Sequence, residues 1–185
     1  MKNKIKQLSI LLFEKKGFTE TSIQDIVESL GVTKGTFYYY FESKEQLLMD
    51  IHMSYIDQLL ERQRAIRQEH HSSRMKLEQI IALLIADIAN HGPSGKVFFR
   101  EMRHLSEDNA VKVKKKREIF RKNLAEIISE GIAQKEFRDK LEPEMVAFAI
   151  LGVTNWSYQW FNPSGKISAD QLARIYSDLI LNGIA

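Results

Sequence analysis

Residues 21–44, TSIQDIVESLGVTKGTFYYYFESK, decide the fold of this chain. Two short segments with helical spacing flank Gly31, and a glycine supplies the turn conformation that residues with a Cβ resist. The apolar side chains that would lock the two segments at a fixed angle are Ile26, Leu30, Val32 and Phe37. This arrangement predicts a helix-turn-helix over about residues 22–41.

Polar residues mark where the helices of this stretch begin. Thr21 and Gln24 have the spacing of a capping box, in which two side chains satisfy the first backbone N–H groups of a helix. Thr33 is placed to cap the second short helix. Ser43 and Gln46 form another capping box, so a further helix is expected directly after the stretch.

Helical spacing continues on both sides of this stretch. The chain has 185 residues, 44% hydrophobic and 28% charged, with only three Pro and nine Gly, so long helices can run unbroken. The other predicted helices cover about residues 5–17, 43–70, 75–90, 96–105, 108–135, 143–161 and 168–182, with residues 91–95 as the clearest loop. We therefore expect an all-α protein of about nine helices. The long helix from residue 43 joins two predicted domains, residues 1–47 and 48–185.

The composition excludes several kinds of protein. Without cysteine the chain has no thiol nucleophile, no thiolate zinc site and no disulfide. The longest apolar stretch, residues 80–89, is about half of the roughly 20 residues that a membrane span needs, and no signal peptide is visible. We expect a cytoplasmic protein without a membrane partner.

Catalytic signatures are missing as well. Residues 93–96 superficially resemble a phosphate-binding loop, but the first glycine is absent and Val97 follows Lys96. The five histidines lack the spacing of a helical metal site. We therefore expect no enzyme: no catalytic residue, no metal site and no cofactor.

The second helix of the predicted helix-turn-helix carries side chains suited to DNA. Its first residues are small or flexible enough to let the backbone approach a major groove, where Lys can donate to guanine and Thr can form hydrogen bonds; they are Thr33, Lys34, Gly35 and Thr36. Tyr38, Tyr39 and Lys44 offer hydroxyl and ammonium donors to phosphate oxygens. Residues 1–50 hold seven basic and seven acidic residues, so their charge alone does not indicate DNA.

Four segments together resemble the N-terminal domain of the TetR family of transcriptional repressors. They are KGF at 16–18, TSIQDI at 21–26, LGVTKGTFYYYF at 30–41 and SKEQLL at 43–48. Ser9 and Val27 depart mildly from the family, which usually has Ala there. The resemblance implies a homodimer that represses genes from a palindromic operator on double-stranded DNA and leaves it when a small-molecule inducer binds the C-terminal domain. It also adds Ser22 and Gln24 to the DNA-binding residues.

The C-terminal part resembles one subgroup of that family. VFFREMRHL at 97–105 and GVTNWSYQWF at 152–161 are similar to regulators of fatty-acid or steroid degradation that respond to acyl-CoA thioesters. The resemblance implies a ligand site formed by Phe98, Phe99, Arg103, Phe120, Phe148, Asn155 and Trp156. For these aromatic residues an ordinary place in the core is the alternative. The alternative function is a repressor of an efflux or stress gene with a hydrophobic or cationic drug-like inducer.

Two apolar stripes near the end of the chain indicate how a homodimer could form. They are Ala149, Val153, Trp156 and Trp160 on one helix, and Leu172, Ile175, Tyr176, Leu179 and Gly183 on the next. Two such helices can pack against their symmetry mates as a four-helix bundle, and burial within one subunit is the alternative. A helical adaptor that binds only protein would share these stripes but would have no use for the polar surface of residues 33–39.

Overall fold

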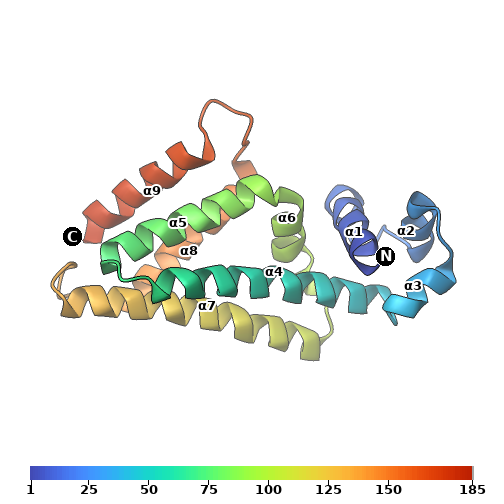
Figure 1. The fold of residues 1–185 in the computed structure, drawn as a ribbon, viewed down its shortest axis with the longest axis horizontal. Helices are drawn as coiled ribbons and strands as arrows, with labels where there is room; N and C mark the ends of the chain where they lie inside the picture. The colour runs from blue at the N-terminus through green and yellow to red at the C-terminus, as the bar shows by residue number, and fades with distance from the viewer. Residues whose placement is uncertain (185) are drawn as a thin grey trace. The chain divides into compact units, whose positions relative to one another are not determined.

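The computed structural model describes residues 1–184, and within them the chain forms nine α-helices, one short 3₁₀ helix and no strand (Figure 1). The helices are α1 (Lys2–Lys16), α2 (Ile23–Leu30), α3 (Lys34–Tyr40), α4 (Lys44–Gln68), α5 (Ser73–Asn90), α6 (Gly92–Arg100), α7 (Glu107–Ala133), α8 (Pro143–Trp160) and α9 (Ala169–Ile184), with the 3₁₀ helix η1 at Met102–His104. The predicted all-α fold is confirmed.

The chain divides into two compact units. The first consists of Met1–Asp57 and Pro93–Lys114, and the second of Gln58–Gly92 with the described residues from Lys115 onward. Helices α4 and α7 each contribute residues to both units. The predicted domain boundary at residues 47 and 48 stays a prediction.

The capping box of α2 lies one residue later than predicted. Ser22 is the N-cap: its Oγ accepts the Asp25 N–H at 3.0 Å, and the Asp25 carboxylate accepts the Ser22 N–H at 2.8 Å. Thr21 is fully buried, and its hydroxyl donates to the Gly17 carbonyl at 2.8 Å. The predicted box of Thr21 and Gln24 is wrong because the Thr21 hydroxyl already serves the end of α1.

Thr33 and Ser43 are confirmed as the other predicted N-caps of the helix-turn-helix, and of the predicted box of Ser43 and Gln46 the bond to the Ser43 hydroxyl is the one described. Thr36 N–H donates to Thr33 Oγ1 at 3.2 Å at the start of α3, and Gln46 N–H donates to Ser43 Oγ at 3.0 Å at the start of α4. Gly31 ends α2 at φ 64°, in the left-handed region that a Cβ disfavours. The turn between α2 and α3 is therefore the one that the glycine predicts.

The predicted loop at residues 91–95 is wrong. Helix α6 begins inside it, at Gly92, and ends at Arg100, while the predicted end of this helix is replaced by η1. Pro93 lies in the first turn of α6, where a backbone N–H has no partner within the helix, so the missing N–H of proline costs nothing there. The glycine and proline thus start a helix here instead of preventing one.

Each unit has its own buried apolar side chains. In the first unit the helix-turn-helix and its neighbours bury Ile5, Phe13, Ile26, Phe37, Leu47 and Leu48. In the second unit α5 packs against α8 and α9, and Ile85 forms a buried cluster with Leu172 and Ala173. Leu172 of the predicted dimer stripe therefore belongs to the interior of the subunit.

No helix within residues 1–184 combines the length and the apolar character that crossing a membrane requires. The same residues contain no group of three or more His, Cys, Asp or Glu side chains placed to hold a metal ion.

Candidate functional site

Helix α3 presents one buried and two exposed aromatic side chains in three consecutive residues. Phe37 is fully buried, whereas Tyr38 is 53% and Tyr39 is 80% exposed. The ring of Phe37 lies 5.7 Å from that of Phe41, measured between centroids, and this contact fixes the rotation of a helix of only two turns. The two tyrosines consequently lie on the solvent side, where their hydroxyls are accessible to a polar partner.

All nine residues predicted to bind DNA lie in the first unit, on α2, α3 and the start of α4. Seven are exposed: Ser22, Gln24, Thr33, Lys34, Gly35, Tyr38 and Tyr39. Thr36 and Lys44 are half-buried. The structure thus brings an exposed set together on the helix-turn-helix, while their contacts with DNA stay a prediction.

Some of these side chains already have partners inside the protein. The Ser22 hydroxyl accepts from the Asp25 N–H and donates to the Asp25 carboxylate, so its single O–H donor is occupied. The backbone and side-chain hydrogen bonds from Ser22 lower the pKa of Asp25 below its usual range. Gln24 donates to Glu28 one turn further on. These contacts hold the first turn of α2 in place.

Lys44 makes contacts that the sequence does not predict. Its Nζ donates to the carbonyl oxygens of Phe18 and Thr21, each at 2.7 Å, and to that of Thr19 at 3.4 Å. The same atom lies 4.3 Å from the centroid of the Phe18 ring. Desolvation lowers the pKa of Lys44, because burial disfavours its ammonium form.

Glu45, which the sequence gives no reason to select, connects the start of α4 with the start of α7. Its carboxylate accepts the Ser106 N–H at 2.7 Å and the Asn109 side-chain amide at 3.0 Å. These hydrogen bonds lower the pKa of Glu45, because they favour the charged carboxylate. An acidic side chain at the N-terminus of a helix also interacts favourably with the helix dipole.

Two more contacts within the first unit connect α1 and its following turn with the segment from α6 to η1. Lys96 pairs with Glu14 at 2.8 Å. The ring of Phe18 stacks on that of His104, with 5.3 Å between the centroids and 27° between the planes. Periodicity could not reveal either pair, because each joins residues more than 80 positions apart.

The residues predicted to bind an effector do not form one set within either unit. Phe98, Phe99 and Arg103 belong to the first unit, and Phe120, Phe148, Asn155 and Trp156 to the second. Phe98 and Phe120 are buried, whereas Phe148 is 54% and Trp156 is 64% exposed. The Arg121 guanidinium lies over the Phe148 ring, 4.7 Å from its centroid. Their binding of a ligand stays a prediction.

Helix α8 exposes a continuous apolar face. Met145, Phe148, Trp156 and Trp160 are each at least half exposed, and they recur at helical spacing along 16 residues. Gly152 lies between them, and a Cβ built there would meet no atom within 4 Å. On α9, Ile175 and Leu179 are 51% and 64% exposed. Large apolar side chains exposed in this number indicate a surface that another molecule covers.

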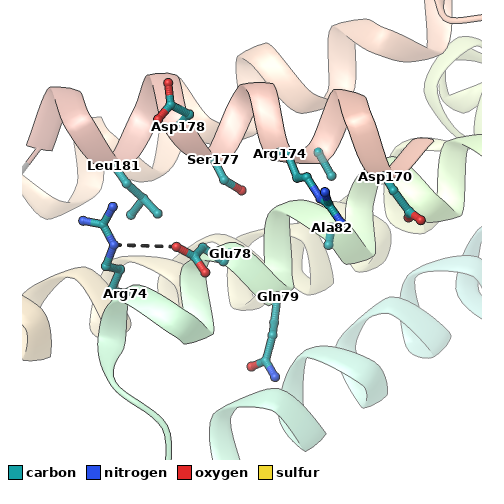
Figure 2. A pocket seen from close by; sticks show the side chains of 10 residues that line it. Arg74, Glu78, Gln79, Ala82, Asp170, Arg174, Ser177, Asp178 and Leu181 are labelled. Atoms are coloured by element: carbon teal, nitrogen blue, oxygen red, sulfur yellow. Dashed lines mark ion pairs between the residues drawn. The ribbon is translucent and has the colours of Figure 1, made fainter. Parts of the chain in front are cut away.

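A groove of about 620 Å³ runs between α5 and α9 in the second unit (Figure 2). Small or apolar residues, Ala82, Ala173 and Leu181, alternate with charged ones along it. The charged residues are Arg74, Glu78, Asp170, Arg174 and Asp178, of which Arg74 and Glu78 form an ion pair at 3.6 Å. None of the residues predicted to bind an effector lines this groove, and its charged lining differs from the mostly apolar pockets that hold small molecules.

Two family models match the chain. The model described as "Bacterial regulatory proteins, tetR family" matches residues 9–51, and the one described as "Tetracyclin repressor-like, C-terminal domain" matches residues 70–184. The first covers the helix-turn-helix, and the second covers most of the remaining chain.

Relatives match over almost the whole length. The chain is 28% identical to the HTH-type transcriptional repressor KstR2 of Mycolicibacterium smegmatis over 186 residues, which span 99% of this chain and 90% of the relative. It is 28% identical to the solved TetR family transcriptional regulator PfmR from Thermus thermophilus, with a TM-score of 0.90 over 96% of this chain and 97% of that one. AibR, solved in complex with isovaleryl coenzyme A and operator DNA, shares the fold at a TM-score of 0.86 and 23% identity, covering 96% of both chains.

Proposed function

The chain belongs to the TetR family of bacterial regulatory proteins, and from that premise we propose that it is a homodimeric transcriptional repressor whose operator binding is controlled by a small molecule. The repressor named KstR2, to which the chain is similar over nearly its whole length, supports this function. The proposed cycle needs no catalytic step, because linked binding equilibria are enough to release the DNA. It would operate in the cytoplasm, where the operator is.

The observation that carries the proposal is the surface of α3. A buried Phe37 anchors the helix while Tyr38 and Tyr39 remain exposed, beside Lys34 at its start. In a helix-turn-helix the second helix enters the major groove, its N-terminal residues contact base edges, and hydroxyl groups nearby bind phosphates. α3 has this composition and exposure.

The proposal is tested with DNA from the protein's own genomic neighbourhood. We expect a mobility shift at low salt that weakens as salt rises, because phosphate contacts release counterions. Lys34→Ala and Tyr38→Phe should weaken binding without changing the mass of the oligomer in solution. Wild-type protein that binds no such fragment contradicts the repressor, and normal affinity in both variants contradicts the assigned contacts.

The homodimer is supported by the apolar faces of α8 and α9. The exposed side chains of Phe148, Trp156 and Trp160 lie on one face of α8, and those of Ile175 and Leu179 on α9. Two copies of each helix can bury these faces in a four-helix bundle around a two-fold axis. Such a dimer presents two copies of α3, which must lie about 34–36 Å apart to enter successive major grooves. Sedimentation of the purified protein should give twice the mass of the chain.

For the inducer we propose an acyl-CoA thioester. The isovaleryl coenzyme A bound to AibR, a protein of the same fold, is the reason to test this chemistry first. The predicted ligand residues have the chemical types that such a ligand needs: aromatic rings in Phe98, Phe99, Phe120, Phe148 and Trp156, and polar donors in Arg103 and Asn155. Phe98 and Phe120 are buried, and Phe148 and Trp156 also lie on the α8 face proposed for the dimer, so a dimer and a ligand compete for these two rings. Acyl-CoA should release the operator and raise the melting temperature, while free CoA should not. Equal effects of the two would contradict an acyl-CoA inducer.

A further inference from the structure

The contacts of Lys44 indicate a different role from the phosphate contact that its sequence context predicts. We propose that Lys44 is a positioning residue: its ammonium holds the turn between α1 and α2 against the start of α4, and so sets the orientation in which the helix-turn-helix meets the operator. The proposal rests on the proposed binding of an operator. It gives Lys44 a role different from the direct DNA contacts proposed for Lys34 and the exposed tyrosines of α3.

The ammonium of Lys44 has no N–H left for a phosphate. A lysine carries three N–H donors and no acceptor, and here the three carbonyl oxygens of Phe18, Thr19 and Thr21 surround Nζ at 2.7, 3.4 and 2.7 Å. Reaching a phosphate would require the side chain to give up at least one of these contacts. Two of them have the short length of charge-assisted hydrogen bonds, which are stronger than neutral ones.

The place of these carbonyls explains what the contact positions. They lie in the turn that follows the end of α1 and directly precedes Ser22, the N-cap of α2. Thr21, in the same turn, is fully buried and donates its hydroxyl to the Gly17 carbonyl. A shift of this turn would therefore move the start of α2, and through the short turn at Gly31 it would move α3.

The aromatic ring of Phe18 completes the site. Nζ lies 4.3 Å from its centroid, within the range of a cation–π interaction, and the ring meets Phe13 edge-on at 5.3 Å. On Phe18 the His104 ring is stacked as well, so η1 contacts the same turn that Lys44 holds. Carbonyl oxygens and an aromatic face together replace part of the water around the half-buried ammonium, as around a structural cation.

The test compares two substitutions, Lys44→Arg and Lys44→Met, in the full-length protein. Arginine keeps the charge and binds phosphate at least as well as lysine, but its planar fork does not match three oxygens arranged around one point. If Lys44 positions the turn, both variants should bind the operator about tenfold more weakly, or worse, with wild-type helix content by circular dichroism. If Lys44 binds a phosphate, Lys44→Arg should bind as tightly as the wild type, which would overturn the proposal.

The salt dependence of operator affinity is a second test with the same variants. Each phosphate contact contributes about 0.9 to the slope of log K against log salt concentration, so losing one contact per subunit of a dimer lowers the slope by about 1.8. We expect Lys44→Arg to retain the wild-type slope while binding weakly. Lys15→Met is the matched control: Lys15 is exposed in the last turn of α1, and its loss should change operator affinity less than twofold.

The outcomes separate this proposal from the proposed function. Wild-type protein that binds no operator fragment contradicts the repressor and leaves the contact itself to be measured by nuclear magnetic resonance. In that case the Lys44 ammonium should show slowly exchanging protons in the wild type and a pKa below the usual value of a lysine. Rapid exchange in the ammonium of Lys44, as in Lys15, would overturn the positioning role. If Lys44→Met does not fold, Lys44→Arg and this measurement still decide.

Discussion

Helices α3 and α8 both expose aromatic side chains, but of different chemistry. On α3 the exposed rings are Tyr38 and Tyr39, which carry hydroxyls, and the apolar ring of Phe37 is fully buried. On α8 the exposed rings are Phe148, Trp156 and Trp160, and none has a hydroxyl. The exposed aromatic surface of α3 can therefore serve a polar polymer, whereas that of α8 is suited to another apolar surface.

The length of the two helices supports the same distinction. α3 has seven residues and depends on one buried ring for its orientation, so small changes in its anchor should affect everything that it presents. α8 has 18 residues and is held along its inner face by Ala147, Ile150, Thr154 and Ser157. We therefore expect that its outer face can be altered without loss of the fold. The following predictions start from this contrast.

The largest effect is expected in α3 when its anchor is removed. Phe37→Ala should lower the free energy of unfolding by about 3–5 kcal/mol, because a fully buried ring is replaced by a cavity. Tyr39→Ala, two residues further on, should change it by less than about 0.5 kcal/mol, because that side chain is 80% exposed. Urea denaturation measures both. Equal losses would show that the two rings are not divided between core and surface.

The next largest effect is expected on α8. Trp156→Arg should weaken self-association by about 2 kcal/mol or more, roughly thirtyfold in dissociation constant, because an exposed apolar side chain of the proposed interface is replaced by a charge on both copies. The melting temperature of the monomer should stay unchanged. Sedimentation over a range of concentrations measures the constant, with Gln134→Arg, exposed near the end of α7, as the control. Unchanged association would remove α8 from the dimer interface.

The sequence predicts the structure best where the structural role of a residue depends on its near neighbours along the chain. Gly31, Thr33 and Ser43 act within four residues of themselves, so pattern alone places the turn and two caps. The capping box of α2 was displaced by one residue because Thr21 is used by α1. That competition for one hydroxyl involves two helices and has no signature in the local pattern.

The candidate effector residues show the limit of such reasoning. Phe98 and Phe148 look alike in the sequence, yet one is buried in the first unit and the other is half exposed in the second. Aromatic content predicts apolar surface, but only the packing of distant helices decides whether that surface becomes core, cavity or interface. The same holds for Lys44, whose carbonyl partners lie more than 20 residues earlier.

A smaller effect is expected when a single hydroxyl is removed from α3. Tyr39→Phe should weaken operator binding by about 1 kcal/mol, roughly fivefold, because it removes a hydrogen-bond donor and keeps the ring. Phe148→Tyr, the reverse exchange on α8, should leave operator binding unchanged at protein concentrations where the dimer is complete. Fluorescence anisotropy with labelled operator measures both variants. A loss in the second variant without a loss in the first would reverse the roles assigned to the two helices.

The smallest expected effect is a pH dependence of stability, which we expect in the first unit but not in the apolar face of α8. Glu45 in the first unit has a pKa below the usual 4.5, because Ser106 and Asn109 donate hydrogen bonds to its carboxylate. A carboxyl group with a lowered pKa in the folded state stabilises the protein above its ordinary pKa, and this contribution is lost as the pH falls through the folded value. Glu45→Gln should therefore be less stable than the wild type at neutral pH. This difference in stability should shrink as the pH falls below about 4.5, because the wild type then loses the contribution of the charged carboxylate.

Because Glu45 is partly solvated, the difference at pH 7 should stay under about 1 kcal/mol. The apolar face of α8 provides the comparison. Met145, Phe148, Trp156 and Trp160 do not ionise, so the dimer constant of Glu45→Gln should follow that of the wild type from pH 7 to pH 5. Urea denaturation and sedimentation of both proteins at several pH values measure the two quantities. A stability difference that stays constant as the pH falls below 4 would show that the contacts of Glu45 do not depend on its charge.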